Sequence, residues 1–303
     1  MFFYMKPNYK SNWPNGSYKE KIIKFIFLTS SILSASIVVF ILGFMIILAF
    51  PVFINGLFFD MLSMPWSPDH GMFGILPMIA GTFCIAGLAV IISLPISLGC
   101  SCFIFLVNPG KSGKFLKKIV EAMTAVPTVI YGFTGIFLLV PLIRNLFHKG
   151  SGMCILSAAI MLGLLITPTM ILFFIQSFSL VPENYLNAVD ALGGNISQKF
   201  FYIVIPNSWK GMITGLILSF GRALGDTLIS LMISGNSTAF PDSVMDSART
   251  LTAHIALVIA ADFDSIEFKT IFLSGICLYL MTATGVILAR VSVKGKIFNN
   301  GHD

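Results

Sequence analysis

Six long apolar runs dominate the sequence, and they restrict the chain to a lipid environment. Each run holds enough apolar residues to cross a bilayer, which takes about 20 in an α-helix. Only 11% of the residues are charged, against about 25% in ordinary soluble domains, so one water-soluble core could not enclose all six runs. We therefore predict an all-α integral membrane protein with about six transmembrane helices. The expected spans are residues 22–50, 77–107, 115–143, 153–178, 211–235 and 266–290.

The distribution of basic residues predicts the orientation of these spans. Most of the 19 Lys and Arg residues lie in the two tails and in the loops after the second and fourth runs, whereas the alternate loops are acidic. By the positive-inside rule, both termini are then cytoplasmic in a multi-pass protein of the cell inner membrane. The same rule accounts for the net charge of +6, so we expect membrane lipid and no nucleic acid as a partner. The first run is too long for a signal peptide, and we expect it to be retained.

A single arginine inside the fifth run is the most informative polar residue. If that helix starts near Gly211, Arg222 lies about 16 Å along it, close to the middle of a hydrocarbon core about 30 Å thick. Such an arginine costs about 2.5–3.5 kcal/mol on translocon scales, so it normally faces a bundle interior or an aqueous path. Asp226 follows at i+4 on the same face. Two interpretations stay open: a fixed internal ion pair, or a guanidinium that binds oxyanions along a path.

The loop of residues 179–210 is long for a chain whose other basic loops are short. Pro182 precedes the stretch from Glu183 to Leu192 and Gly193 follows it, which are helix start and stop signals. We predict a short surface helix there and expect Pro206 to interrupt the chain before the next span. The loop could be a simple re-entry into the membrane or a docking helix for a cytoplasmic partner.

The same loop resembles the EAA loop of ABC-importer permeases. The resemblance rests on Asn187-Ala188-Val189, then Gly193, then Ile203-Val204-Ile205-Pro206. It implies that the helix is a coupling helix that sits in a groove of an ATPase subunit. Asn187 stands where the family has glutamate, and Val189 stands where alanine is usual. The implied coupling residues are Asn187, Ala188, Gly193 and Pro206.

Further motifs are similar to those of phosphate-importer permeases, and specifically to the PstC-type subunit. Residues 221–227 read Gly-Arg-Ala-Leu-Gly-Asp-Thr, with Asp226 where the family has glutamate. Residues 127–132 read Pro-Thr-Val-Ile-Tyr-Gly, and residues 234–236 read Ser-Gly-Asn. The similarity runs from about residue 72 to 290, and it includes the stretches 73–77, 81–82 and 249–256.

This resemblance implies a type I, MetI-like permease fold and a phosphate path. The implied path residues are Arg222, Asp226, Thr227, Thr128 and Tyr131. Hydroxyl groups can donate hydrogen bonds to an oxyanion, but hydrogen bonds between helices explain the same residues. The domain division that follows is a cytoplasmic tail (1–21), a first helix with an outer loop (22–71), the permease domain (72–290) with coupling loop 183–206, and a cytoplasmic tail (291–303).

The resemblance also implies partners. These are a paralogous PstA-type permease, two PstB-type ATPase subunits and an extracytoplasmic PstS-type phosphate-binding protein. Gly110-Lys111-Ser112 mimics the end of a P-loop, but Phe105 replaces the required glycine. We therefore expect no cofactor in this chain, with ATP and magnesium on the ATPase. The histidines and cysteines show no metal-ligand spacing, and no nucleophile–base pair points to an enzyme.

Two other functions remain open at this point. One is a permease for another oxyanion, such as molybdate or sulfate. The other is a proton-coupled secondary carrier that works alone, with Arg222 and Asp226 as a proton relay. The long loop of residues 179–210 argues against the second, since a carrier without an ATPase needs no docking helix.

Overall fold

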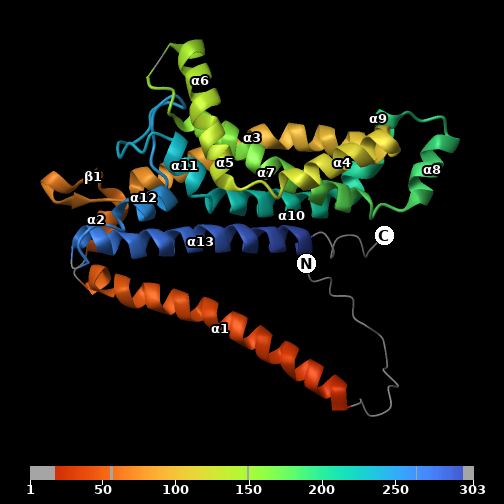
Figure 1. The fold of residues 1–303 in the computed structure, drawn as a ribbon. Helices are drawn as coiled ribbons and strands as arrows, with labels where there is room; N and C mark the ends of the chain where they lie inside the picture. The colour runs from red at the N-terminus through yellow and green to blue at the C-terminus, as the bar shows by residue number, and fades with distance from the viewer. Residues whose placement is uncertain (1–17, 55–56, 149, 264, 296–303) are drawn as a thin grey trace. The chain divides into compact units, whose positions relative to one another are not determined.

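The computed structural model describes residues 18–54, 57–148, 150–263 and 265–295, and these are almost entirely helical (Figure 1). The chain divides into two compact units, residues 1–47 and 48–303. Most of each predicted tail, 1–21 and 291–303, lies outside the described residues. The predicted all-helical fold is confirmed.

The first described elements lead from the N-terminal helix into a small hairpin. Helix α1 is followed by the short helix α2 and by strands β1 and β2, which pair antiparallel with Trp66 opposite Phe73. Gly71 closes the hairpin at φ +69°, a conformation that glycine adopts without strain. The bounds are α1 Tyr18–Ile54, α2 Leu57–Ser63, β1 Trp66–Ser67, η1 Pro68–His70 and β2 Met72–Phe73.

The remaining helices form the body of the second unit. Several are joined by π-helical turns, which Figure 1 does not label separately. The bounds are α3 Leu76–Cys102, η2 Phe103–Val107, α4 Lys111–Met123, α5 Thr128–Thr134, η3 Gly135–Leu139, α6 Val140–Phe147, α7 Ile155–Phe178, α8 Glu183–Ala191, α9 Ile196–Gln198, η4 Lys199–Val204, α10 Ile205–Leu224, α11 Leu228–Ile233, α12 Leu251–Val258 and α13 Ile266–Gly295.

Helix α7 is the centre of the core. It packs against α3 and α10, and α13 lies along the other side of α10 (Figure 1). Small residues allow the α3–α7 approach, because a Cβ on Gly163 would lie 3.2 Å from the carbonyl oxygen of Ala89. A hydrogen bond of 2.9 Å between the Ser93 and Thr167 hydroxyls joins the same two helices. Close packing and buried hydroxyl bonds are what holds helices together where lipid removes the hydrophobic driving force.

Five helical segments in the described part of the chain are long and apolar enough to cross a membrane. They agree with the predicted first, second, fourth and sixth spans, while the third is shorter than predicted. The segments are Glu20–Phe50, Leu76–Val107, Thr128–Phe147, Ile155–Phe178 and Ile266–Ile287.

The predicted third span of residues 115–143 is wrong at its start. Residues before Pro127 do not continue into a spanning helix, because a proline disfavours helical geometry in the residue before it. The chain instead forms the separate amphipathic helix α4, with lysines along one side, and a turn before α5. The spanning segment therefore begins at Thr128.

The predicted fifth span of residues 211–235 is not among these segments, and both of its ends are wrong. Pro206 was expected to interrupt the chain before the helix, but α9, the π-helical turn η4 and α10 follow one another without a break, and Pro206 is the second residue of α10. The helix then ends at Leu224, and a new helix, α11, begins at Leu228. The break of residues 225–227 falls inside the predicted path motif.

Candidate functional site

Hydrogen bonds from α11 and α12 stabilise the break between α10 and α11. The Asp226 carboxylate accepts a hydrogen bond of 2.9 Å from the backbone N–H of Ile229, which caps the start of α11. The hydroxyl of Thr252 donates to the Asp226 backbone oxygen at 2.9 Å. Asp226 is 8% exposed, so these bonds satisfy polar groups that would otherwise be buried without partners. Non-helical backbone at membrane depth is tolerated where it lines a cavity or is buried in protein.

A cavity of about 360 Å³ lies at this break. It brings together four of the five predicted path residues: Arg222 from α10, Asp226 and Thr227 from the break, and Thr128 from the start of α5. Leu165 of α7, Gly225 and Leu228 of α11 also line the cavity, and none of the three was predicted from the sequence. The cavity thus combines one cation, one carboxylate and two hydroxyls with apolar walls.

Tyr131 does not line this cavity. It lies one turn beyond Thr128 on α5, and its hydroxyl donates to the backbone oxygen of Met123 at 3.4 Å. That bond joins α5 to the end of α4, so the Tyr131 hydroxyl forms a hydrogen bond between helices, which was one of the two interpretations of these hydroxyls.

The Arg222 side chain has a different partner from the one expected. Its Nη1 donates a hydrogen bond of 2.7 Å to the hydroxyl of Thr169 on α7. In the described ranges no ion pair joins Arg222 to Asp226; the ion pairs found there are elsewhere. The fixed internal pair, one of the two interpretations that the sequence left open, is not formed; the Asp226 carboxylate instead accepts from the backbone of α11. Sequence reasoning missed Thr169, although a hydroxyl beside Pro168 in an apolar run was a usable signal.

The predicted coupling segment folds as a surface helix. α8 spans Glu183–Ala191, close to the predicted Glu183 to Leu192, and none of its residues is buried. Asn187 and Ala188 lie exposed on it. Gly193 follows the helix at φ +73° and reverses the chain. Pro206 lies in the first turn of α10 and is well separated in sequence from the other three coupling residues.

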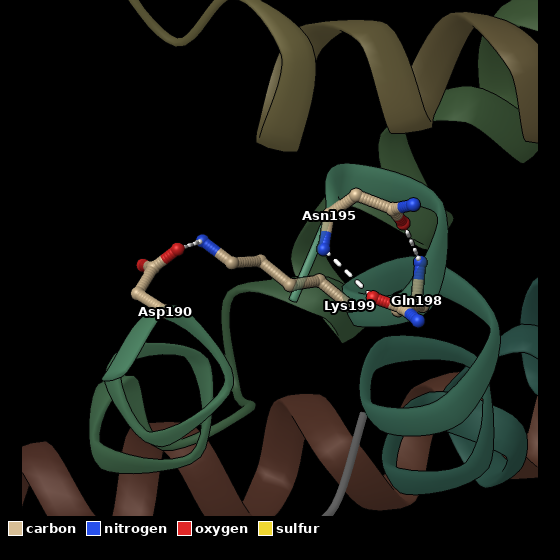
Figure 2. Close-up of polar contacts among 4 residues, drawn as sticks. All are labelled: Asp190, Asn195, Gln198 and Lys199. Carbon is tan, nitrogen blue, oxygen red and sulfur yellow. Dashed lines mark hydrogen bonds and ion pairs between the residues drawn. The ribbon is translucent and has the colours of Figure 1, made fainter. Parts of the chain in front are cut away.

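Two sets of polar contacts hold the far side of this loop in place (Figure 2). The side chain of Asn195 accepts a hydrogen bond from the backbone N–H of Gln198, and the side chain of Gln198 accepts one from the backbone N–H of Asn195. Both bonds are 2.8 Å long. This capping box starts α9. An ion pair of 2.5 Å joins Lys199 to Asp190 at the end of α8, so the two arms of the loop are linked across the turn.

No group of three or more His, Cys, Asp or Glu side chains gathers in the described ranges as a metal site would require. The polar groups of the cavity suit an anion better than a cation, since the guanidinium and hydroxyls are hydrogen-bond donors.

The chain resembles known membrane transport proteins along most of its length. The profile of the family described as "Binding-protein-dependent transport system inner membrane component" matches residues 91–294. The chain is 29% identical over 231 residues to the probable ABC transporter permease protein YqgH of Bacillus subtilis, with 75% of each protein covered. It is 27% identical over 250 residues to the phosphate transport system permease protein PstC of Haemophilus influenzae, covering 75% of this chain and 78% of that one.

Solved structures agree with the fold. One is the MetNI methionine ABC transporter in inward-facing conformations, with a TM-score of 0.56, 15% identity and coverage of 73% of this chain and 96% of the other. Another is a bacterial ABC transporter involved in alginate import, with a TM-score of 0.57, 13% identity and coverage of 92% and 99%. At such identities the likeness concerns the fold alone, and it confirms the predicted permease fold.

Proposed function

Because the chain belongs to the family of binding-protein-dependent transport system inner membrane components, we propose that it is the PstC-type permease subunit of an ABC importer for inorganic phosphate. Relatives named as PstC phosphate permeases support the substrate. The observation that carries the proposal is the cavity at the helix break, where Arg222 is bonded to a neutral hydroxyl and faces two further hydroxyl-bearing residues.

The proposed path runs through this cavity. Arg222 lowers the electrostatic cost of a multiply charged anion near the middle of the bilayer, because a guanidinium stays ionised and forms paired hydrogen bonds to tetrahedral oxyanions. Thr128 and Thr227 supply hydroxyl donors. Asp226 keeps the break open by capping α11, so its part is to shape the site. Tyr131 supports α5 beside the cavity.

The proposed energy source is a separate ATPase. A member of this family works with an ATPase and a binding protein, and here we propose two PstB-type ATPase subunits, a PstA-type permease that completes the path, and a PstS-type phosphate-binding protein outside. The exposed helix α8 and the turn at Gly193 are the proposed contact to the ATPase. This chain then needs no cofactor and catalyses no reaction; ATP and magnesium bind to the partner.

The proposed placement follows the distribution of charge. The chain is an inner membrane component, and we propose that both termini are cytoplasmic, so that the basic loops and α8 lie on the ATPase side. Residues 72–290 are the proposed permease domain, with residues 22–71 as the preceding helix and outer loop.

Uptake of radiolabelled phosphate tests the proposal. Phosphate-starved cells that lack other phosphate importers are compared with and without the gene, with sulfate, molybdate or arsenate in excess as competitors. We expect deletion to abolish uptake, and arsenate alone to compete, because it shares the charge and shape of phosphate. Unchanged phosphate uptake after deletion would rule out phosphate as the substrate. Competition by sulfate or molybdate would point to another oxyanion.

A further inference from the structure

The Arg222 guanidinium is held by a side chain that the proposed path does not include. Its Nη1 lies 2.7 Å from the hydroxyl oxygen of Thr169 on α7, and both residues are half-buried. We propose that Thr169 is a positioning residue for anion transport, which fixes the guanidinium at the cavity without neutralising its charge. This inference rests on the proposed function.

The half-buried guanidinium of Arg222 needs a hydrogen-bond acceptor. A charged donor taken out of water is strongly destabilised unless hydrogen bonds replace its hydration. Thr169 accepts one of its hydrogen bonds. An arginine offers five N–H donors, so the bond to Thr169 orients the side chain and leaves other donors for a ligand.

Thr169 lies on the central helix of the core. Of the apolar stretch of α7 that could span the membrane, 72% is buried, and Ile166 and Met170 on the same helix are fully buried. Residues packed on all sides have little freedom to move. A bond to α7 therefore ties the guanidinium to the packed core of the molecule.

The neutral hydroxyl of Thr169 also leaves the charge of Arg222 unpaired. Asp226 lines the same cavity, and an arginine paired with a carboxylate has little net attraction left for an anion. In the described ranges no ion pair joins the two: Asp226 accepts from the backbone N–H of Ile229, and Arg222 donates to the Thr169 hydroxyl. A neutral anchor leaves the positive charge of Arg222 available to phosphate. Thr169 thus acts against the Arg222–Asp226 pair.

The test uses the complete transporter, assembled with its partner permease, ATPases and binding protein in proteoliposomes. Thr169 is changed to Val, which keeps the shape and removes the acceptor, and to Ser, which keeps the acceptor. Thr214→Val is the matched control, because Thr214 lies exposed on α10, away from the cavity. Initial rates of labelled phosphate, sulfate and molybdate uptake are measured per assembled complex, along with ATPase activity.

We expect Thr169→Val to lower the maximal phosphate uptake rate by about tenfold or more, which is the scale of a hydrogen bond to a charged group. The KM should stay unchanged, since the binding protein sets it, and ATPase stimulation by loaded binding protein should remain. Thr169→Ser and Thr214→Val should stay within about twofold of wild type. A merely structural role for Thr169 would instead reduce assembly and ATPase activity together.

A second comparison tests the electrostatic step. Asp226→Asn removes the carboxylate charge, while its amide oxygen can still cap α11. In that background Arg222 has no carboxylate to pair with, so adding Thr169→Val should cost much less than tenfold. If Asp226→Asn alone abolishes uptake, the comparison of Thr169→Val with Thr169→Ser decides whether Thr169 positions the guanidinium.

Two outcomes would overturn the inference: Thr169→Val transporting within twofold of wild type, or Thr169→Ser failing as badly as Thr169→Val. Failure of the proposed function looks different, because the wild-type complex would then carry sulfate or molybdate in place of phosphate. The Thr169 variants would be scored with that anion. A wild-type complex that carries none of the three overturns both proposals.

Discussion

At the scale of single residues, the proposed function depends most on Arg222 and its surroundings. Sequence position alone indicated a functional arginine, because a charge deep in an apolar run is costly. The identity of its partner could not be predicted in the same way. Asp226 at i+4 would be the natural partner in a continuous helix, but the helix ends at Leu224 and Asp226 turns to cap the next one.

Substitution of Arg222 should separate charge from geometry. Arg222→Ala removes both, and we expect phosphate uptake per assembled complex to fall by at least about tenfold, the scale of lost charged hydrogen bonds. Arg222→Lys keeps the charge but offers a compact ammonium that cannot form the paired bonds of a guanidinium, so its rate should lie between those of alanine and wild type. A lysine variant as slow as alanine would show that charge alone is insufficient. An alanine variant as fast as wild type would remove Arg222 from the path.

A second residue-scale prediction concerns His254 on α12, which is not among the segments that span the membrane. Its Nε2 lies 3.0 Å from the Thr270 hydroxyl, and its ring packs edge-on against Trp66. Burial, with the nearby Arg249 cation as a smaller cause, lowers the pKa of His254 from 6.5 to about 3. The folded protein therefore holds this imidazole neutral, whereas the unfolded chain would protonate it below pH 6.5.

The neutral His254 should therefore cost no stability above pH 6.5. As the pH decreases from 6.5 toward 3, the free energy of unfolding should fall by up to about 1.4 kcal/mol per pH unit because of this residue. Thermal midpoints of the purified protein at pH 7.5, 6.0 and 5.0 measure the effect. His254→Gln has no group that titrates there, so its midpoint should depend less on pH than that of wild type. Equal pH dependence in both proteins would contradict the buried neutral histidine.

At the scale of elements, the sequence predicted helices better than their ends. Most apolar runs became spanning helices as expected, since length and hydropathy determine them. The errors fall near Pro127, where the spanning segment begins later than predicted, and around α10, which begins and ends earlier than predicted. At the end of α10, the Thr252 hydroxyl donates to the backbone oxygen of Asp226, and a bond between residues so far apart in sequence cannot be read from a local pattern.

Two glycines on α3 test the contact that places α12 beside the cavity. A Cβ on Gly81 would lie 2.6 Å from the backbone oxygen of Arg249, whereas a Cβ on Gly87 would meet nothing within 4 Å. Gly81→Ala should therefore push away the start of α12 and lower stability by about 1–3 kcal/mol. Gly87→Ala should leave the thermal midpoint unchanged or slightly raised, because alanine favours helix. Equal midpoints for the two variants would show that the α3–α12 contact is not close.

The turn after α8 is the second element whose role can be tested. Gly193 has φ +73° and open space around its Cα, so any effect of substitution reports backbone strain. Asn tolerates this conformation better than Ala does. We expect Gly193→Ala to reduce ATPase co-purification and ATP-driven uptake more than Gly193→Asn. Equal effects of the two variants would mean that the turn conformation is not needed for docking.

For the whole molecule, the alternation of basic and acidic loops predicts the sidedness of the chain. A membrane-impermeant maleimide should label Asp242→Cys in intact cells and Lys114→Cys only after permeabilisation. Both positions are exposed, and they lie on segments of opposite charge, Asp242 in an acidic loop and Lys114 on the basic helix α4. The native protein, whose five cysteines are all free thiols in the structure, is the control for background labelling. The reverse pattern would place α8 outside the cell and exclude its contact with an ATPase.

The central claim is that this chain carries phosphate through the cavity at Arg222, driven by a partner ATPase. The most direct test is phosphate import into proteoliposomes that contain the full complex, with ATP on the ATPase side and loaded binding protein on the other. The account predicts import that requires ATP and this chain, and that is lost in an assembled Arg222→Ala complex. Import that continues without ATP, or at the wild-type rate in the Arg222→Ala complex, would contradict it.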